Sequence, residues 1–511
     1  MVLALERRVL PPTLHVSEPT PHVDWSAGGV RLLTGAVELP GSGPVRAGVS
    51  SFGVSGTNAH VIVESAPEVE DVLPVRGPVR GPVVGGGAVV WVVSGRSAAA
   101  LRGQAARLVE FAAGVPDGEL AGVGRVLAGR SVFGYRAVVV ASDRAELLAG
   151  LAAVAAGESH AAVVSGSAVA DAQPVLVFPG QGSQWAGMAV ELLECCEVFR
   201  AEVERCDRVV RSLTGWSVVG VLRGAAGAPG LEGSPVVQPV LWAVMVGLAA
   251  VWRAAGVAPR AVVGQSQGEM AAACVAGVLS LEDAARVVVL RSRALEKVLG
   301  TGGMAALDVS ASRAGELIGS RWAGRLWVAV HSGPASCVVA GEVAALEELE
   351  QLPGVRVRRV AVDYASHTPH MDRLAEELGV ALAGVRPVDG AGVGFCSSVE
   401  GGFLDAARLS GRYWVENLCR PVLFEESVRA AAGVGGPVFV EVSPHPVLVG
   451  DVEDICRAAG VEAGVCGSLR RGEGGSRRML LSLAQAWVLG VPVAWPLVLG
   501  EGPAPSGQPP T

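Results

Sequence analysis

Lysine is almost absent from this chain of 511 residues, and no run of basic side chains occurs in it. Lys297 is the only lysine, so nearly all of the 41 basic residues are arginines, set among 49 acidic residues for a formal net charge of −8. Proteins that bind nucleic acids neutralise phosphates with clustered positive charge. We therefore expect no nucleic acid among the partners of this protein.

Cysteine spacings typical of disulfide frameworks or zinc sites are lacking as well. The nine cysteines are an odd number, and no two of them form a C-x-x-C pair. The first residues, Met1 to Arg7, have no basic segment ahead of an apolar stretch, which a secretory signal would need. A reducing cytoplasm is the predicted location, and neither a metal ion nor a resident cofactor is expected.

No uninterrupted apolar run is long enough to cross a bilayer. The longest apolar stretches, 236–251 and 261–279, are broken by Gln, Ser, Glu or Arg, whereas a spanning helix needs about 20 apolar residues. Hydrophobic residues make up 50% of the chain and charged residues only 18%, which excludes wholesale disorder and permits large buried cores. We expect several compact domains and no membrane partner.

The composition along the chain predicts four parts, of which two precede the main domain. Residues 1–66 hold Pro-rich turns and two strand-like runs, near 47–50 and 60–63, too few for a closed domain. Residues 67–173 begin with a linker composition of Pro, Gly and Val over 72–87 and continue as a small α/β unit. That unit carries no cluster of reactive side chains, so we interpret it as a spacer between its neighbours.

The third part, residues 174–469, is predicted to be a larger α/β domain. Apolar strands at 175–178 and 261–263 each run into a Gly-containing turn and then a helix, which indicates parallel strands with crossover helices. Within this domain, residues 303–362 follow the order β-α-β-β-α-β, typical of an inserted ferredoxin-like subdomain.

The fourth part, residues 470–511, holds one helical pattern and a short apolar segment. It ends in a tail from Gly500 that is rich in Gly and Pro. Exposed chain ends of this composition are poorly ordered unless tied down, and we expect the tail to be disordered.

The strongest chemical signal is the sequence G-Q-S-Q-G at 264–268, between an apolar strand and a helix expected over 269–278. A tight strand-to-helix turn of this kind, a nucleophile elbow, would present the hydroxyl of Ser266 at the helix N-terminus. The main-chain amide of Gln267 would then face a developing oxyanion. The alternative is a packing turn, because G-x-S-x-G arises by chance in a chain with 69 glycines.

A serine nucleophile needs a general base, and the chain has eight histidines. His367 lies in D-Y-A-S-H-T-P-H at 363–370, directly after the last strand of the predicted subdomain, where a loop returns the chain to the main domain. His370 is the rival, although the spacing favours His367. The other histidines lie outside the main domain or follow strands, as ordinary turn residues do: His15, His22, His60, His160, His331 and His445.

Two further features could complete a site. F-P-G-Q-G-S-Q at 178–184 is a second strand-to-turn element, in which Gln181 or the main-chain amides could serve an oxyanion hole, unless it is a Gly-rich turn without a ligand. Arg291 lies in an otherwise apolar helical pattern, and a buried guanidinium needs an anion. That anion could be the carboxylate of Glu269 or Asp283, or a substrate carboxylate bound as a fork.

The combination of these motifs with Y-A-S-H at 364–367 resembles the acyltransferase domain of modular type I polyketide synthases, which are relatives of malonyl-CoA:acyl carrier protein transacylases. S-F-G-V-S-G-T-N-A-H at 51–60 resembles the C-terminal end of a ketosynthase. Residues 67–173 are similar to the linker between ketosynthase and acyltransferase, and residues 470–511 to the linker that follows the acyltransferase. The resemblance implies an α/β-hydrolase-like core with an inserted ferredoxin-like subdomain, preceded by a small α/β linker domain.

The resemblance also implies roles for the residues of the site. Ser266 would be the acylated nucleophile and His367 its general base, with Gln181 and the amide of Gln267 in the oxyanion hole. The family has no acidic third member of a hydrolase triad. A backbone carbonyl orients the imidazole instead, and Asn417 matches that position.

Substrate selection is implied by a second group of residues. Arg291 matches the arginine that grips the free carboxylate of a malonyl-type acyl group. The Y-A-S-H form is associated with methylmalonyl-CoA, since Ser366 after Tyr364 leaves space for a methyl branch where other relatives carry Phe, and Gln238 and Gln267 point the same way. The expected partners are methylmalonyl-CoA, the phosphopantetheine thiol of an acyl carrier protein, and an adjacent ketosynthase domain.

Departures from the family pattern motivate two other functions. Gln265 stands where the family usually has His, and the usual Asn of the subdomain is replaced near 331–334. The ketosynthase portion starts after the region of its catalytic Cys and His residues, so no condensation is expected on this chain alone. The alternatives are a serine hydrolase or thioesterase, which would want an acidic residue between Ser and His, and a catalytically impaired docking fragment.

Overall fold

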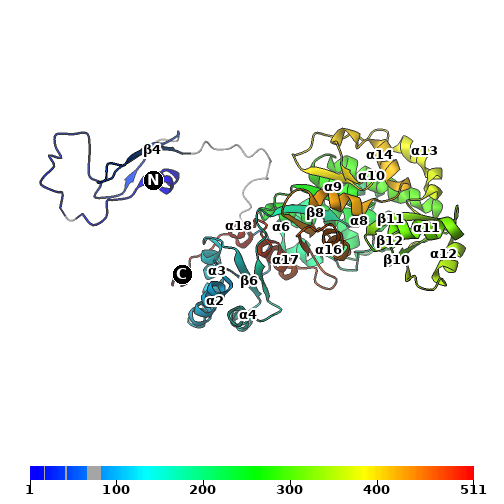
Figure 1. Ribbon diagram of the computed structural model, residues 1–511, viewed down its shortest axis with the longest axis horizontal. Helices are drawn as coiled ribbons and strands as arrows, with labels where there is room; N and C mark the ends of the chain where they lie inside the picture. The colour runs from blue at the N-terminus through cyan, green and yellow to red at the C-terminus, as the bar shows by residue number, and fades with distance from the viewer. Residues whose placement is uncertain (17, 41–42, 66–81, 511) are drawn as a thin grey trace. The chain divides into compact units, whose positions relative to one another are not determined.

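The computed structural model describes residues 1–16, 18–40, 43–65 and 82–510, and it divides the chain into two units, Met1–Pro78 and Val79–Thr511 (Figure 1). Most of the predicted linker stretch 72–87 lies outside the described residues. Its last part is not a free linker, because Val83 and Val84 are buried and the carbonyl of Val83 accepts a hydrogen bond from the thiol of Cys196.

The first unit contains two small antiparallel pairs of strands. Both strand-like runs expected in this region are present, and they form one hairpin in which Val49 faces Val61. Its turn closes through the amide of Gly53, which donates to the carbonyl of Thr57 at 2.9 Å. The elements are α1 (Val2–Glu6), β1 (Val9–Leu10), β2 (Val37–Glu38), β3 (Arg46–Phe52) and β4 (Asn58–Glu64).

The second unit begins with a three-stranded antiparallel sheet of order β5-β6-β7. The first helix of this region spans Ala98–Ala113, and Ser97 caps its start by accepting from the amide of Ala100. Trp91 is fully buried at the centre of the small core and donates to the carbonyl of Leu120 at 2.9 Å. The elements are β5 (Val89–Gly95), α2 (Ala98–Ala113), η1 (Asp117–Glu119), α3 (Leu120–Ala128), β6 (Tyr135–Ala141), α4 (Arg144–Ala156) and β7 (Val163–Ser167).

The C-terminal tail packs on these helices, and the expectation that it is disordered is wrong for the residues described. Arg130 donates to the carbonyls of Pro509 and Pro510, at 2.5 and 2.6 Å, and Gln104 also donates to Pro510. Arg125 donates to the carbonyl of Pro503. Prolines have no N–H with which to form a helix or ladder, so the carbonyls of this segment accept from side chains instead.

The main domain is built on a six-stranded sheet of order β15-β14-β9-β8-β16-β17, parallel except for β15. The strands β8, β9 and β16 are valine-rich and buried on both faces, as parallel strands covered by helices are. Leu176 and Val262 face the core that contains α6, α8, α9 and α10, and Val177 faces the core with α15 and α16. The strands are β8 (Gln173–Phe178), β9 (Ala261–Gly264), β14 (Gly394–Ser397), β15 (Gly402–Phe403), β16 (Pro437–Glu441) and β17 (Gly464–Gly467).

The helices of this domain and of the C-terminal segment complete the two layers. The helix after the elbow spans Gly268–Ala276 and ends where Gly277 adopts a left-handed conformation, φ 72°. The others are α5 (Val190–Cys195), α6 (Glu197–Thr214), α7 (Val218–Leu222), α8 (Ser234–Ala254), α9 (Gly268–Ala276), α10 (Leu281–Ala294), η2 (Leu295–Val298), η3 (Pro369–Met371), α13 (Asp372–Ala381), η4 (Ala406–Arg408), α14 (Gly411–Cys419), α15 (Phe424–Ala432), α16 (Val449–Ala458), α17 (Ser476–Val488) and α18 (Trp495–Leu499).

Helix α8 is, among the residues described, long and apolar enough to cross a membrane when judged by length and composition alone. Inside the domain, 83% of its most apolar stretch is buried. Gln238, Trp242 and Trp252 on this helix are all buried, and the last donates to the hydroxyl of Ser468. A core helix of a globular domain has these properties.

The predicted ferredoxin-like subdomain is confirmed between η2 and η3 (Figure 1). Its sheet has the order β11-β12-β10-β13 with every pair antiparallel, which is the arrangement that β-α-β-β-α-β units adopt. The last strand is shorter than expected. The elements are β10 (Gly303–Leu307), α11 (Ala311–Arg321), β11 (Leu326–Gly333), β12 (Ser336–Gly341), α12 (Val343–Glu350) and β13 (Val357–Arg359).

Candidate active site

The turn between β9 and α9 has the backbone of a nucleophile elbow. Ser266 adopts a left-handed conformation with φ 53°, which is uncommon for a residue with a side chain. A side chain at Gly264 would collide with the backbone of Glu269, and one at Gly268 would collide with the carbonyl of Phe178. The two glycines therefore let the turn pass close to its neighbours, and the turn presents Ser266 at the start of α9.

His367 is in hydrogen-bond contact with this serine. The distance between Ser266 Oγ and His367 Nε2 is 2.8 Å. His367 Nδ1 lies 3.1 Å from the carbonyl oxygen of Arg420, and its amide donates to the carbonyl of Leu418 at 3.0 Å. Because Nδ1–H donates to a carbonyl, Nε2 carries the lone pair and accepts from the serine.

The electrostatic surroundings keep this imidazole neutral. Burial, and after it the positive charge of Arg291, lower the pKa of His367 to about 3. A neutral ring at pH 7 can accept a proton, which is what a general base must do. His370, the rival base, does not contact Ser266, and its ring packs edge-on against Trp327 with 5.2 Å between ring centroids.

Arg291 is buried beside the same serine without a carboxylate partner. Its Nη1 donates to Gln238 Oε1 at 3.1 Å and its Nη2 to Ser266 Oγ at 3.2 Å, while Nε has no partner. In the described part of the chain neither Glu269 nor Asp283 forms an ion pair with it. Burial lowers the pKa of Arg291 to about 10, so the group is still a cation at pH 7.

Gln181 and Gln267 lie in the two turns where the sequence places them. Gln181 Oε1 accepts from the hydroxyl of Ser234 at 3.3 Å, and that hydroxyl is 2.7 Å from the hydroxyl of Tyr364. The side chain of Gln267 is buried and reaches only the carbonyl of Pro179, at 3.5 Å. Its main-chain amide precedes α9 and makes no hydrogen bond to any residue that the structure describes.

The side chain of Asn417 holds the turn that contains Ser266 and does not contact the imidazole ring. Its Nδ2 donates to Glu269 Oε2 at 2.6 Å and to the carbonyl oxygen of Ser266 at 3.3 Å. The carbonyl of Asn417 also favours the protonated ring of His367, but it is the carbonyl of Arg420, three residues further along the chain, that accepts the hydrogen bond from Nδ1–H. Sequence reasoning did not single out Arg420, since any carbonyl in this turn was equally eligible.

Glu269 is a buried carboxylate that sequence reasoning considered only as a partner for Arg291. It accepts from the amide of Ser398, from the hydroxyl of Tyr413 at 2.8 Å and from Asn417. Burial raises the pKa of Glu269 to about 7. The only sequence signal was its place directly after the elbow, in the first turn of α9.

Two of the three residues expected to select the acyl group, Tyr364 and Ser366, are buried close to the base in the sequence. Tyr364 is 5% exposed and bonds to Ser234. The hydroxyl of Ser366 lies 3.3 Å from the sulfur of Met304, which belongs to the ferredoxin-like subdomain. Gln238, expected in the same role, contacts Arg291 instead of these two residues. Met304 lies in no motif from which sequence reasoning could have found it.

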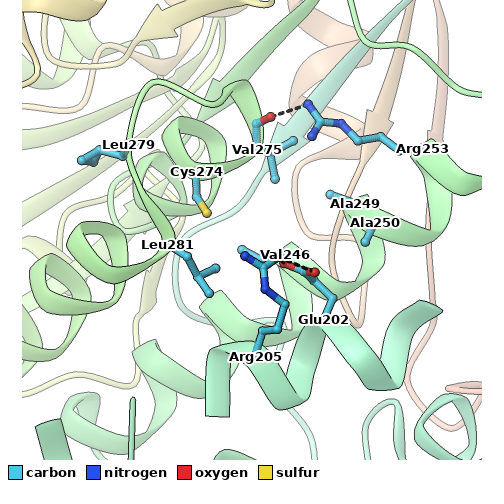
Figure 2. Close-up of a pocket in the computed structure, with 10 residues that line it drawn as sticks. All are labelled: Glu202, Arg205, Val246, Ala249, Ala250, Arg253, Cys274, Val275, Leu279 and Leu281. Carbon is cyan, nitrogen blue, oxygen red and sulfur yellow. Dashed lines mark hydrogen bonds and ion pairs between the residues drawn. The ribbon is translucent and has the colours of Figure 1, made fainter. Parts of the chain in front are cut away.

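A separate cavity of about 270 Å³ opens beside the far end of α9 (Figure 2). Figure 2 shows Arg253 directed at the carbonyl of Val275, with Cys274 and the pair of Glu202 and Arg205 around the space. None of its lining residues belongs to the predicted site. Among the residues described, no group of three or more His, Cys, Asp or Glu side chains could hold a metal ion.

Two protein families match this chain. Residues 175–493 match the family described as the acyl transferase domain. Residues 19–127 match the family described as the ketoacyl-synthetase C-terminal extension. The first match includes each of the predicted site residues discussed above.

Similar proteins and structures are polyketide synthases and their domains. The chain is 49% identical over 502 residues to a mycoketide-CoA synthase of Mycobacterium tuberculosis, and 48% identical over 518 residues to an erythronolide synthase of Saccharopolyspora erythraea. It spans only 12% and 14% of the lengths of these two relatives. The structure of the acyltransferase domain from module 8 of the salinomycin polyketide synthase is 47% identical, with a TM-score of 0.79, and the alignment covers 81% of this chain and 99% of that domain.

Proposed function

The chain belongs to the acyltransferase domain family of modular type I polyketide synthases and carries a ketosynthase C-terminal extension, and from this we propose that it loads an extender unit from coenzyme A onto the phosphopantetheine thiol of an acyl carrier protein. One observation carries the proposal. A serine in a strained elbow contacts a neutral histidine, at 2.8 Å, beside a buried arginine that has no counter-ion among the residues described.

The first half-reaction transfers the acyl group to the enzyme. Ser266 Oγ attacks the thioester carbon while His367 Nε2 takes the hydroxyl proton. The tetrahedral intermediate collapses as the bond from carbon to sulfur breaks, and the departing thiolate of coenzyme A takes the proton from His367. The products are an ester on Ser266 and free coenzyme A.

The second half-reaction reverses these roles with a new thiol. His367 removes the proton from the phosphopantetheine thiol, whose sulfur attacks the ester carbon. The bond to Ser266 Oγ breaks, and His367 returns the proton to the serine. The carbonyl of Arg420 at 3.1 Å supports the imidazolium that forms in both halves, because it accepts from Nδ1–H.

The oxyanion of each tetrahedral intermediate is proposed to lie at the N-terminus of α9. The free main-chain amide of Gln267 supports this, since preorganised donors at a helix N-terminus stabilise developing negative charge. Gln181 lies on the neighbouring strand end, and its oxygen is already engaged by Ser234. Its amide nitrogen is therefore the group proposed to donate.

The acyl group is proposed to carry a free carboxylate that pairs with Arg291. A fully buried cation without a counter-ion costs free energy, which a substrate carboxylate would recover. Gln238 supports the proposal because it holds Nη1 at 3.1 Å and so orients the planar guanidinium. Nε, without a partner, remains for the ligand.

Methylmalonyl is the proposed acyl group. Ser366 is smaller than the Phe of other relatives, and its hydroxyl lies against the sulfur of Met304. A Phe ring at this position would have to occupy the space of that methionine or the space of a substrate methyl group. Tyr364 is anchored through Ser234. The discrimination available is limited, because one methyl in a pocket is worth about 1 to 3 kcal/mol.

The partners and the setting belong to the same proposal. The match of residues 19–127 to the ketoacyl-synthetase extension supports an adjacent ketosynthase domain. A cytoplasmic location is proposed, as are the domain boundaries at 66, 173 and 469. No cofactor is proposed for this chain, since coenzyme A and phosphopantetheine enter as substrate and acceptor.

Labelling with radioactive methylmalonyl-CoA tests the function. Stable label on the protein that is lost in Ser266→Ala would support acyl transfer, as would its passage to a holo carrier protein. Rapid release of free methylmalonate in place of stable label would indicate a hydrolase. No label at all would indicate a docking fragment, and either of the last two results would contradict the proposal.

A further inference from the structure

Four neighbouring parallel strands of the main sheet end level with one another. The register aligns Val263 of β9, Val177 of β8, Glu441 of β16 and Gly467 of β17. Ser266 comes three residues after the first of these and Arg470 three residues after the last. The strand ends that lead to Ser266 and to Arg470 thus lie in one row, three strand spacings or about 14 Å apart.

The loops of this row are joined to one another. Trp185, in the segment after β8, donates from Nε1 to the carbonyl of Pro444 in the loop after β16, at 3.0 Å. The loop after β16 contacts the loop after β17, because the amide of Leu469 donates to the carbonyl of Ser443 at 3.2 Å. The loops that lie between Ser266 and Arg470 are therefore in direct contact with one another.

The far end of the row carries three basic side chains, His445, Arg470 and Arg471, which we call the basic cluster. The amide of Arg471 donates to His445 Nδ1 at 3.2 Å. Because Nδ1 accepts this bond, the neutral ring carries its hydrogen on Nε2, which can donate to an anion. Arg470 and Arg471 are exposed, so their guanidinium groups are accessible.

The basic cluster lacks compensating negative charge. In the part of the chain that the structure describes, no carboxylate forms an ion pair with Arg470 or Arg471, and Glu473 pairs with Arg478 at 4.0 Å. Burial lowers the pKa of His445, and the positive charges of Arg471 and Arg470 lower it further. Burial and then the charge of Arg470 also lower the pKa of Arg478. These groups repel one another, and an anion would relieve that repulsion.

We propose that the basic cluster binds the 4′-phosphate of the phosphopantetheine arm, which coenzyme A and the carrier protein share, while the sulfur end of the arm reaches Ser266. The inference rests on the proposed function. The arm between sulfur and phosphate is comparable to an extended peptide of four to five residues, about 15 Å, and the row spans about 14 Å. Arginine forks match the geometry of phosphate oxygens.

The test compares the double variant Arg470→Ala/Arg471→Ala with the parent protein, using methylmalonyl thioesters of pantetheine, 4′-phosphopantetheine and coenzyme A. The specificity constant for acylation of Ser266 by the phosphopantetheine ester is expected to fall about tenfold or more, since bonds to charged groups are strong. The pantetheine ester, which has no phosphate, is expected to react unchanged. Arg313→Ala, an exposed arginine of α11 paired with Glu316, is the matched control and should change neither.

A second arm of the experiment identifies the source of the phosphate. Protein acylated beforehand with the pantetheine ester is mixed with holo carrier protein, with phosphopantetheine or with pantetheine, and the rate of acyl transfer is measured. A phosphate-dependent loss in the donor arm assigns the site to coenzyme A, and one in the acceptor arm assigns it to the carrier protein. Either result supports the inference, and higher ionic strength should reduce the advantage of the phosphate in the parent protein.

Three results would overturn the inference: no loss in either arm, an equal loss with pantetheine, or a loss confined to coenzyme A and absent for phosphopantetheine. Equilibrium binding of phosphopantetheine and pantetheine, measured by calorimetry, keeps this test separate from the proposed function. Should the parent protein take no label from any ester, the proposed function fails. The inference still fails on its own if both proteins bind phosphopantetheine equally well.

Discussion

The amide of Asn417 bridges the nucleophile turn to a buried carboxylate, since Nδ2 lies 2.6 Å from Glu269 Oε2 and 3.3 Å from the carbonyl oxygen of Ser266. Glu269 is in the first turn of α9, and Asn417 is on α14, whose C-terminal end leads to the carbonyl of Arg420 that holds His367. The carboxylate thus ties the helix of the nucleophile to the helix that positions the base.

Glu269 is therefore predicted to be a positioning residue. All of its hydrogen-bond partners are donors. In Glu269→Gln an N–H group of the new amide would face at least one of these donors, and the hydrogen-bond network would be disrupted. We expect the rate of self-acylation at saturating substrate to fall about tenfold to a hundredfold while KM changes little, because a misplacement of about 1 Å can slow a positioned reaction by about a hundredfold. Glu416→Gln, a half-buried glutamate of the same helix α14 that pairs with Arg412, is the control. An unchanged kcat would contradict the prediction.

His367 is predicted to act as the sole general base. His367→Ala should lower self-acylation by a factor of about 10² to 10⁴, the usual contribution of a positioned base, and Ser266→Ala should abolish it. His370→Ala should retain substantial activity, because that ring packs on Trp327. Label incorporation over time measures all three variants. Equal losses from the two histidine substitutions would refute the assignment.

Arg291→Ala is predicted to destroy the use of dicarboxylic acyl esters and to spare simple acyl esters comparatively. Removing one partner of a buried charge pair typically costs about 3 to 5 kcal/mol, or more than a hundredfold in rate. Parallel assays with methylmalonyl-CoA and propionyl-CoA measure the difference. If turnover of the dicarboxylic ester were unchanged, the carboxylate would have to bind elsewhere.

The same substitution is predicted to change the pH profile. The charge of Arg291 helps to hold the pKa of His367 at about 3, and catalysis needs the neutral ring, so activity is lost as the pH falls through that value. Without the cation the pKa rises toward its ordinary value, and the acidic limb of kcat/KM for simple acyl esters moves to higher pH. Arg293→Ala, on the same helix, should leave the limb in place. A limb that did not move would show that burial alone sets this pKa.

Methylmalonyl-CoA is predicted to be preferred over malonyl-CoA by a factor of about ten to two hundred in specificity constant. Replacing Tyr364 with His and Ser366 with Phe should reduce the preference. Because Ser366 contacts Met304, we expect the added substitution Met304→Ala to restore part of it by making room for the ring. Competition between the two esters in one reaction measures the ratio. Predominant malonyl transfer by the parent protein would disprove the selectivity.

Individual helices and strands could be predicted because the residues within them and directly beside them determine their structure. Ser97 caps the helix at Ala98–Ala113, and the valine-rich strand Tyr135–Ala141 is apolar enough to be buried. The order of elements over residues 303–362 was sufficient to predict the ferredoxin-like topology, since few pairings suit a β-α-β-β-α-β unit. The same reasoning gave the wrong result for the tail after Gly500. This tail is held in place by Arg125 and Arg130, which are far away in the sequence.

The sequence by itself determined the turn that presents Ser266, the proposed nucleophile, since that turn needs the small residues Gly264 and Gly268 on either side. Only the tertiary structure decided what meets that serine. His367 and Arg291 approach Ser266 from 101 and 25 residues away, and Arg420 rather than Asn417 bonds to the ring. The physical reason is that backbone conformation is set by near neighbours, whereas these contacts exist only because helices and strand ends pack at one edge of the sheet.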